Sequence, residues 1–247
     1  DVRDGEYTPD GSKEWTRLRY ENKLNNMARV LNELGTDYNK KGLAAVGLCE
    51  VENRGVLEDL VQTGKLAKRK WSIVHGDSPD KRGIDNALLY NPKMFEVLSH
   101  DYHNAGVFRD GERVFTRDIL LVQGILGKAD TVFILVNHWP SRYGGQEKSD
   151  PLRKQAAATN RRLVDSLLQR QPDAEILVMG DLNDDPKDES VKVVLGTTPV
   201  MTEAGSMLYN PFELIHEGDE GSLKYRGEWN LFDQIILSKG ALNAGKW

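Results

Sequence analysis

The stretch Ile176-Leu-Val-Met-Gly-Asp-Leu-Asn183 decides the fold, because an apolar run here gives way abruptly to polar side chains. Four consecutive apolar residues predict a short buried strand over 176–179. The Gly-Asp pair that follows is a turn signal and marks the end of that strand. A buried strand therefore delivers Asp181, and Asn183 two residues later, to its carboxyl end.

Two other apolar runs end in the same way. The run over 43–49 is followed by Glu50, and the run over 131–136 is followed by an asparagine and then His138. In α/β sheets, the crevice beyond the carboxyl ends of the strands is the usual ligand site. If the three strands run parallel as neighbours, their polar side chains converge with Asp181 and Asn183 in one pocket.

The rest of the chain alternates between helical and extended patterns. Apolar residues at helical spacing predict helices over 13–34, 56–66 and 152–168. Apolar runs between turn signals predict strands over 43–48, 71–74, 84–90, 95–102, 114–126, 131–136, 176–179 and 231–237. Helices that alternate with two groups of strands predict a single α/β domain over 1–247, with two sheets and helices outside.

Composition excludes several classes of protein. The 247 residues are 39% hydrophobic and carry a net charge of −5, which excludes disorder as the dominant state. No apolar run approaches the length of a membrane span, and the sequence does not assign a compartment. One cysteine, Cys49, excludes an internal disulfide and a cysteine-based zinc site. A chain with an acidic balance has no global basic field for nucleic acid.

The polar residues at the strand ends suit one kind of chemistry. Carboxylate and amide oxygens are hard donors that favour Mg²⁺, Mn²⁺ or Ca²⁺ over zinc. A divalent ion beside an imidazole and an amide is what phosphate-ester hydrolysis needs. Each residue alone also has a structural interpretation: Glu50 as a helix cap, the segment after Asp181 as a turn, and His138 as a core histidine.

Six segments occur in the order of a known family. They are Gly47-Leu-Cys-Glu-Val51, Arg82-Gly-Ile-Asp-Asn-Ala-Leu-Leu-Tyr90, Thr116-Arg-Asp118, Val136-Asn-His-Trp-Pro-Ser-Arg142, Gly180-Asp-Leu-Asn-Asp-Asp-Pro186 and Phe232-Asp-Gln-Ile-Ile-Leu-Ser238. Together they resemble the endonuclease/exonuclease/phosphatase superfamily, which has the DNase I-like fold. The resemblance covers about residues 43–238. It implies a four-layer α/β/β/α sandwich and a divalent metal, with in-line attack of water on a phosphate ester.

The resemblance also implies roles for individual residues. Glu50 would be the metal ligand, and Asp181 would orient or deprotonate the attacking water. Asn183 would bind the phosphate, and His138 would donate to a nonbridging phosphate oxygen. Asp233 matches the strand aspartate that orients the general-base histidine of the family.

Three further residues are expected nearer the substrate. Arg117 and Arg142 are placed to contact the substrate phosphate, with a structural ion pair as the alternative for each. Asn86 is expected close to the site. In the loop 137–145, which resembles that of bacterial nuclease-type members, an indole and a phenol are candidates for stacking on a base or for packing against the protein.

Two departures from the family pattern concern the ends of the chain. The first-strand asparagine of the family is missing, and no histidine follows Ser238. We therefore expect the chain to be a fragment that lacks both terminal segments, and we expect it to be monomeric. The sequence predicts a metal-dependent phosphodiesterase or nuclease acting on DNA or RNA. The alternatives are a phosphatase or a lipid or inositol-phosphate phosphodiesterase on the same scaffold, or a non-catalytic binding member.

Overall fold

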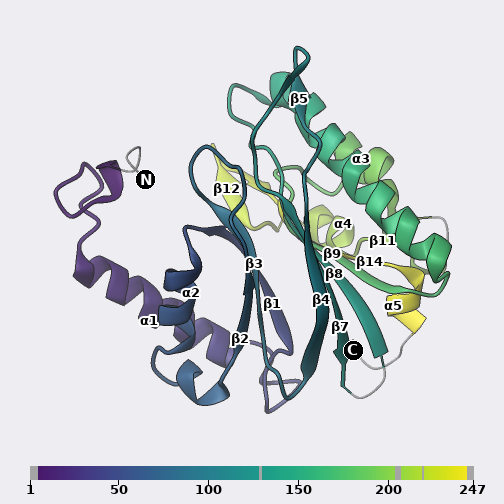
Figure 1. The fold of residues 1–247 in the computed structure, drawn as a ribbon. Helices are drawn as coiled ribbons and strands as arrows, with labels where there is room; N and C mark the ends of the chain where they lie inside the picture. The colour runs from purple at the N-terminus through teal and green to yellow at the C-terminus, as the bar shows by residue number, and fades with distance from the viewer. Residues whose placement is uncertain (1–4, 128–129, 204–206, 219, 244–247) are drawn as a thin grey trace.

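Two β-sheets pack face to face between layers of helices in the computed structural model (Figure 1). The structure describes residues 5–127, 130–203, 207–218 and 220–243. The smaller sheet has the order β1-β3-β2, and the larger has the order β10-β11-β14-β9-β8-β7-β4. Strand β1 of the smaller sheet contacts β8 and β9 of the larger one. The two sheets therefore share one buried interface.

The strands have the following bounds. The smaller sheet consists of β1 (Ala45–Val51), β2 (Ser72–His75) and β3 (Asp85–Tyr90). The larger sheet consists of β4 (Phe95–His103), β7 (Ile119–Leu126), β8 (Asp130–His138), β9 (Glu175–Asp181), β10 (Thr197–Thr198), β11 (Leu208–Tyr209) and β14 (Asp233–Leu237). Two separate ribbons are formed by β5 (Phe108–Arg109) with β6 (Glu112–Arg113), and by β12 (Leu223–Tyr225) with β13 (Glu228–Asn230).

Helices cover both outer faces of the sandwich. Over the smaller sheet lie α1 (Arg17–Glu33) and α2 (Arg54–Val61), followed by a 3₁₀ turn at Leu66–Arg69. Over the larger sheet lies α3 (Gln146–Arg170), with a π-helical turn at Ser190–Gly196. The short helices are α4 (Phe212–Glu217), α5 (Lys239–Asn243) and the 3₁₀ turns Gly5–Tyr7 and Met201–Glu203. None of the helices in these described ranges is long and apolar enough to cross a bilayer.

The apolar runs of the sequence are continuous because both faces of each sheet are buried. Leu88 and Leu89 are neighbours on β3, yet Leu88 packs in the interface between the sheets and Leu89 packs under the helices. The sheets approach closely at Gly47, where a Cβ atom would lie 2.9 Å from the sulfur of Met179. Alternating side chains thus fill two apolar layers around every central strand.

The predicted four-layer α/β/β/α class is confirmed, while three details differ. The strand predicted over 114–126 begins only at Ile119, and Arg117, which precedes it, donates to Asp80. Helix α3 begins at Gln146, six residues before the predicted start, and includes Pro151. The polar region 197–228, which carried no element prediction, contains short strands and α4.

Candidate active site

The three predicted strand ends meet at one end of the sandwich, although they do not belong to a single parallel sheet. Strands β8 and β9 are parallel neighbours, and their register places His138 beside Asp181. Strand β14 runs antiparallel to β9 and places Asp233 opposite Asp181. Glu50 arrives from the facing sheet, where the thiol of Cys49 donates to the carbonyl of Asn137 at 3.1 Å. The assumption that all three strands are parallel neighbours is therefore wrong for β1, because the pocket is assembled across two sheets.

Asp181 is the electrostatic centre of this group. Its Oδ1 accepts the backbone N–H of Asn183 at 2.9 Å, and its Oδ2 lies 3.6 Å from Nε2 of His138. Burial, together with the negative charges of Asp233 and Glu50, raises the pKa of Asp181 to about 6. Burial is the larger cause of this shift, and the two neighbouring carboxylates add to it.

His138 is held as a neutral ring. Its side chain is only 3% exposed, and its Nδ1 has no hydrogen-bond partner among the described residues. Burial, reinforced by the positive charges of Arg117 and Arg82, lowers the pKa of His138 to about 3. A neutral imidazole donates one hydrogen bond and accepts another, which suits contact with a phosphate oxygen.

Backbone conformation places Asn183 beside this pair. Gly180 has φ 129°, and a Cβ atom there would lie 1.9 Å from the carbonyl oxygen of Asn137, so only glycine fits. Asn183 itself is left-handed, with φ 52°. Its side-chain amide donates to the carbonyl of Trp139 at 2.9 Å. The segment after β9 therefore bends sharply and holds its amide against the histidine loop.

The carbonyl of Trp139 also binds the first of the two predicted phosphate-contacting arginines. Nη2 of Arg117 donates to that carbonyl at 2.6 Å, and Nη1 donates to Asp80 at 3.1 Å. Burial lowers the pKa of Arg117, whose side chain is 5% exposed. Arg82, on the same loop as Asp80, reaches to 3.9 Å from the carboxylate of Glu50. Arg117 is thus a buried positive charge that acts on His138 and Asp181.

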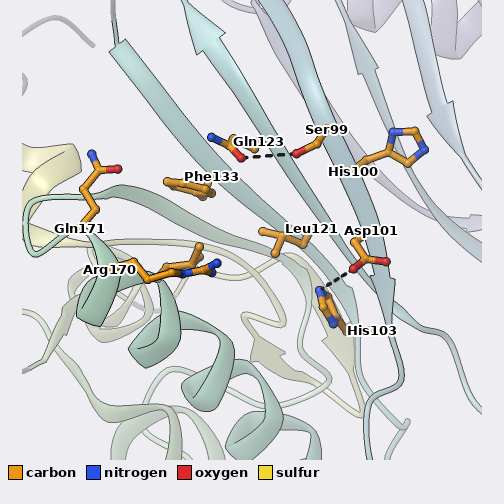
Figure 2. A pocket seen from close by; sticks show the side chains of 10 residues that line it. Ser99, His100, Asp101, His103, Leu121, Gln123, Phe133, Arg170 and Gln171 are labelled. Carbon is orange, nitrogen blue, oxygen red and sulfur yellow. Dashed lines mark hydrogen bonds and ion pairs between the residues drawn. The ribbon is translucent and has the colours of Figure 1, made fainter.

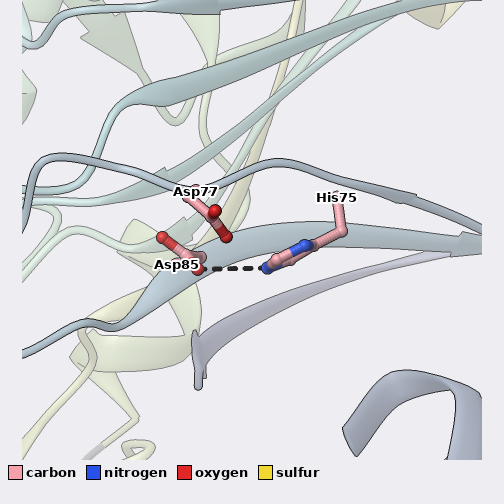
Figure 3. Close-up of side chains that lie close together, drawn as sticks. All are labelled: His75, Asp77 and Asp85. Carbon is pink, nitrogen blue, oxygen red and sulfur yellow. Dashed lines mark hydrogen bonds and ion pairs between the residues drawn. The ribbon is translucent and has the colours of Figure 1, made fainter. Parts of the chain in front are cut away.

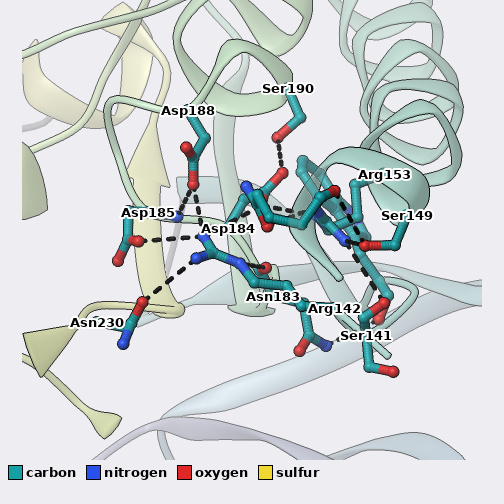
Figure 4. Close-up of polar contacts among 12 residues, drawn as sticks. Ser141, Arg142, Ser149, Arg153, Asn183, Asp184, Asp185, Asp188, Ser190 and Asn230 are labelled. Carbon is teal, nitrogen blue, oxygen red and sulfur yellow. Dashed lines mark hydrogen bonds and ion pairs between the residues drawn. The ribbon is translucent and has the colours of Figure 1, made fainter. Parts of the chain in front are cut away.

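Arg142 lies among carboxylates (Figure 4). Its Nη2 contacts Asp184, Asp185 and Asp188 at 3.2, 3.1 and 2.6 Å, and its Nε donates to the carbonyl of Asn183 at 2.9 Å. These contacts favour a structural ion pair for Arg142, which is the alternative to phosphate contact given by the sequence. A contact between Arg142 and substrate phosphate stays a prediction.

Sequence reasoning missed the support of this loop by a fully buried ion pair. The side chains of Arg153 and Asp184 are both 0% exposed and lie 2.7 Å apart. Asp184 also accepts from Ser190 at 2.6 Å and from Gln146 at 3.1 Å. The available signal was an arginine three residues before Ala156, on the apolar side of the predicted helix. This pair fixes the backbone one residue beyond Asn183.

Asn86 and Trp139 have structural partners. The amide of Asn86 donates to the carbonyl of Asp118 at 2.8 Å and joins the two sheets. Trp139 is 1% exposed, and its indole N–H donates to Asn137 at 3.1 Å, so its ring is not free to stack on a substrate. Tyr143, the other aromatic residue of that loop, is 92% exposed.

The carboxylates at the strand ends are of the type that a divalent cation binds, but among the described residues no three of their ligand atoms lie within 4.8 Å of one another. Glu50, Asp181 and Asp233 offer hard oxygen donors, and burial, with a smaller contribution from the other two carboxylates, raises the pKa of Asp181. A bound cation would stabilise the ionised form of Asp181. The identity of the ion is not fixed by these donors, which suit Mg²⁺, Mn²⁺ and Ca²⁺ alike.

A second group of possible ligands lies on the outer face of the smaller sheet (Figure 3). Ligand atoms of His75, Asp77 and Asp85 lie within 4.8 Å of one another, the one such group of three found in the described part of the chain. Asp85 binds His75 at 3.1 Å and accepts the backbone N–H of Ser78 at 2.6 Å. These bonds also give the group a structural role, because they fasten the loop that carries Asp80.

A cavity that the structure forms lies elsewhere (Figure 2). It measures about 540 Å³ and opens between the outer face of the larger sheet and the end of α3. Its lining includes His103, Phe133 and Arg170 and none of the predicted site residues. The strand-end group is therefore identified by its chemistry rather than by the volume of a pocket.

Comparisons with known proteins agree with this arrangement. A family model described as "Endonuclease/Exonuclease/phosphatase family" matches residues 1–247. No curated protein matches the sequence. The catalytic domain of human Nocturnin, solved with a bound sulfate anion, is similar with a TM-score of 0.63 and 15% identity, over 90% of this chain and 76% of that one.

Two further solved structures show the same likeness. Zebrafish (D. rerio) TDP2, complexed with a single strand DNA product, has a TM-score of 0.56 and 16% identity, over 87% of this chain and 78% of that one. A functionally unknown conserved protein from Enterococcus faecalis V583 has a TM-score of 0.60 and 12% identity, over 94% of this chain and 83% of that one. At these identities the likeness shows the fold.

Proposed function

Because the chain belongs to the endonuclease/exonuclease/phosphatase family, whose members are hydrolytic phosphoesterases, we propose that it is a metal-dependent phosphodiesterase that cleaves DNA or RNA. The observation that carries this proposal is the junction of Glu50, His138, Asp181 and Asp233 at one end of the sandwich. Asp181 lies 3.6 Å from the neutral imidazole of His138, and the charges of Glu50 and Asp233 act on Asp181. Phosphate-ester hydrolysis needs this combination of metal ligands and a hydrogen-bond donor.

Each residue has a role that follows from its surroundings. Glu50, with the neighbouring carboxylates, would hold a divalent cation, which when bound screens the phosphate charge and stabilises the leaving oxygen. Asp181, with a pKa of about 6, is ionised at neutral pH yet basic enough to accept a proton from the attacking water. His138 and the amide of Asn183 donate hydrogen bonds to the phosphate oxygens. Arg117 adds positive charge behind them.

Nucleic acid is the substrate class that we favour. The zebrafish protein with the same fold is complexed with a single strand DNA product, which supports a polynucleotide here. The net charge of −5 is no obstacle, because a bound cation would supply positive charge at the site, beside Arg82 and Arg117. A phosphomonoesterase or a lipid phosphodiesterase on this scaffold would use the same residues, so the substrate decides between them.

A substrate panel tests the proposal. The purified protein is incubated with Mg²⁺, Mn²⁺ or Ca²⁺, and plasmid nicking and oligonucleotide cleavage are measured beside phosphate release from nucleotides and inositol phosphates. We expect polynucleotide cleavage that EDTA abolishes and that Asp181→Asn lowers at least about a hundredfold. Phosphate release without polymer cleavage would replace the proposal by a phosphatase. Hydrolysis of neither class with all three metals would overturn it.

A further inference from the structure

The β12–β13 ribbon carries exposed aromatic and basic side chains on a sharply defined hairpin. Its turn is formed by Arg226 and Gly227, both left-handed with φ 52° and 93°. These values match the I′ turn, whose twist fits the two strands of a hairpin. Every residue of β12 is exposed, as are the first two residues of β13. The ribbon therefore projects a defined surface into solvent.

The base of this ribbon is fastened to the candidate active site. The hydroxyl of Ser222 accepts the backbone N–H of Asp233 at 3.2 Å. At the other strand, Arg142 donates to Asn230 at 3.3 Å, and the N–H of Leu231 donates to Asp185 at 2.6 Å. These bonds place the base of the ribbon beside Asp233 and the loop that follows β9 (Figure 4).

Two rings on the ribbon are each paired with a cation. Tyr225 is 59% exposed and Trp229 is 41% exposed. The guanidinium of Arg226 lies 5.2 Å from the centroid of Tyr225, and the ammonium of Lys224 lies 5.2 Å from the centroid of Trp229. In strand register, Lys224 and Trp229 share one face, while Tyr225 shares the other with Glu228. Flat rings beside cations thus occur on both faces.

We propose that this ribbon binds the unpaired bases and the phosphates of a single-stranded polynucleotide whose scissile ester lies in the strand-end pocket. The proposal rests on the proposed function and names the form of its substrate. Every base has a flat face that stacks on an aromatic ring, and the neighbouring cations match the phosphates. Lys224 and Arg226 outweigh Glu228, so the ribbon is positive in a chain with a net charge of −5.

Two other occupants fit the ribbon less well. The bases of a duplex are already stacked on one another, so exposed rings at the side of a pocket do not reach their faces. A membrane wedge needs apolar residues at its tip, whereas the tip here is Arg226-Gly227, and the apolar residues are divided between the two faces. Duplex DNA and lipid are therefore the competing ligands in the test.

Binding is measured without turnover, by fluorescence anisotropy of a short labelled oligothymidylate in EDTA. We expect Tyr225→Ala and Trp229→Ala each to weaken binding by at least about fivefold, the lower end of base-stacking contributions. Trp229→Phe keeps a ring and should restore most of the affinity. Lys224→Gln should lower the salt dependence of binding. Tyr38→Ala removes a phenol that is 98% exposed elsewhere, and serves as the matched control.

The outcomes separate this inference from the proposed function. Because the assay needs no hydrolysis, it reports on the ribbon even if the enzyme acts on another ester. Affinities of the two alanine variants within twofold of the unmodified chain would overturn the inference. Tighter binding of a duplex of equal length would also overturn it, as would stronger partition onto phosphatidylcholine/phosphatidylglycerol vesicles than onto the oligonucleotide.

Discussion

The carboxyl of Asp181 should make the protein less stable, because it is ionised in a place that disfavours its charge. Burial and the negative charges of Asp233 and Glu50 raise its pKa from 3.8 to about 6. At about 1.4 kcal/mol for each pKa unit, the ionised group costs about 3 kcal/mol above pH 6. The side chain is 28% exposed, so solvent screening reduces this figure to about 2 kcal/mol.

Asp181→Asn removes the charge and keeps the shape. The amide oxygen of asparagine still accepts the N–H of Asn183, which is the bond that Oδ1 of Asp181 accepts at 2.9 Å. The variant should therefore be more stable than the unmodified chain by about 2 kcal/mol at pH 8 without metal. It should at the same time lose at least about a hundredfold in turnover. A gain in stability with a loss of activity is typical of a residue kept for function.

The pH dependence of this gain has a definite sign. Because the folded pKa lies above the unfolded one, the folded state holds the proton between pH 3.8 and about 6. Over this window the stability of the unmodified chain falls as pH rises. The advantage of Asp181→Asn should thus be absent near pH 3.8, grow as pH rises, and reach its full value above about pH 6.

Urea denaturation at several pH values in EDTA measures this difference, with the exposed Asp37→Asn as a control that should change nothing. Repeating the series with Mg²⁺ should stabilise the unmodified chain and not the variant, because a ligand stabilises only the state that binds it. Equal stabilities above pH 6, or near-normal turnover of the variant, would refute the reasoning about Asp181.

Further predictions concern other parts of the site. His138→Gln should remove an acid sensitivity: the folded pKa of His138 lies near 3, so the unmodified chain should lose about 2 kcal/mol from this residue between pH 6.5 and 5, measured by urea denaturation. Arg153→Met removes the fully buried partner of Asp184, which then keeps the ion pair with Arg142 at 3.2 Å, and should cost about 3 kcal/mol, measured by thermal unfolding; a loss below 1 kcal/mol would contradict a buried ion pair. Gly180→Ala should lower both stability and turnover, because its Cβ meets a backbone carbonyl, and normal values for both would contradict the left-handed bend.

The sequence predicted the individual strands and helices of this protein better than it predicted which strands lie next to one another. Apolar runs such as 176–179 are readable because both faces of a central strand are buried, and this property does not depend on which strand lies next to it. Pairing depends on contacts between distant segments. That is why the sequence could bring Glu50 to His138 only on the condition that their strands are parallel neighbours, while the structure brings Glu50 from the facing sheet.

Local support of the site was also beyond the sequence. The motif after β9 predicted Asp181 and Asn183 correctly as neighbours at a strand end. The position of Arg153 on the apolar side of the predicted helix signals that it is buried, but a single sequence does not identify Asp184, which follows Asn183, as its partner. Likewise, the ribbon 223–230 carries a strand pattern over only four alternating residues, Leu223 to Arg226, and no element was predicted there.

The location of the bound cation tests the account most directly. Mn²⁺ binding is followed by calorimetry for the unmodified chain, for Glu50→Ala and for His75→Asn, which removes a member of the second group of possible ligands. The account predicts that Glu50→Ala abolishes or strongly weakens binding, while His75→Asn binds as the unmodified chain does. Unchanged affinity in Glu50→Ala, with binding lost in His75→Asn, would place the cation outside the strand-end pocket and contradict the account.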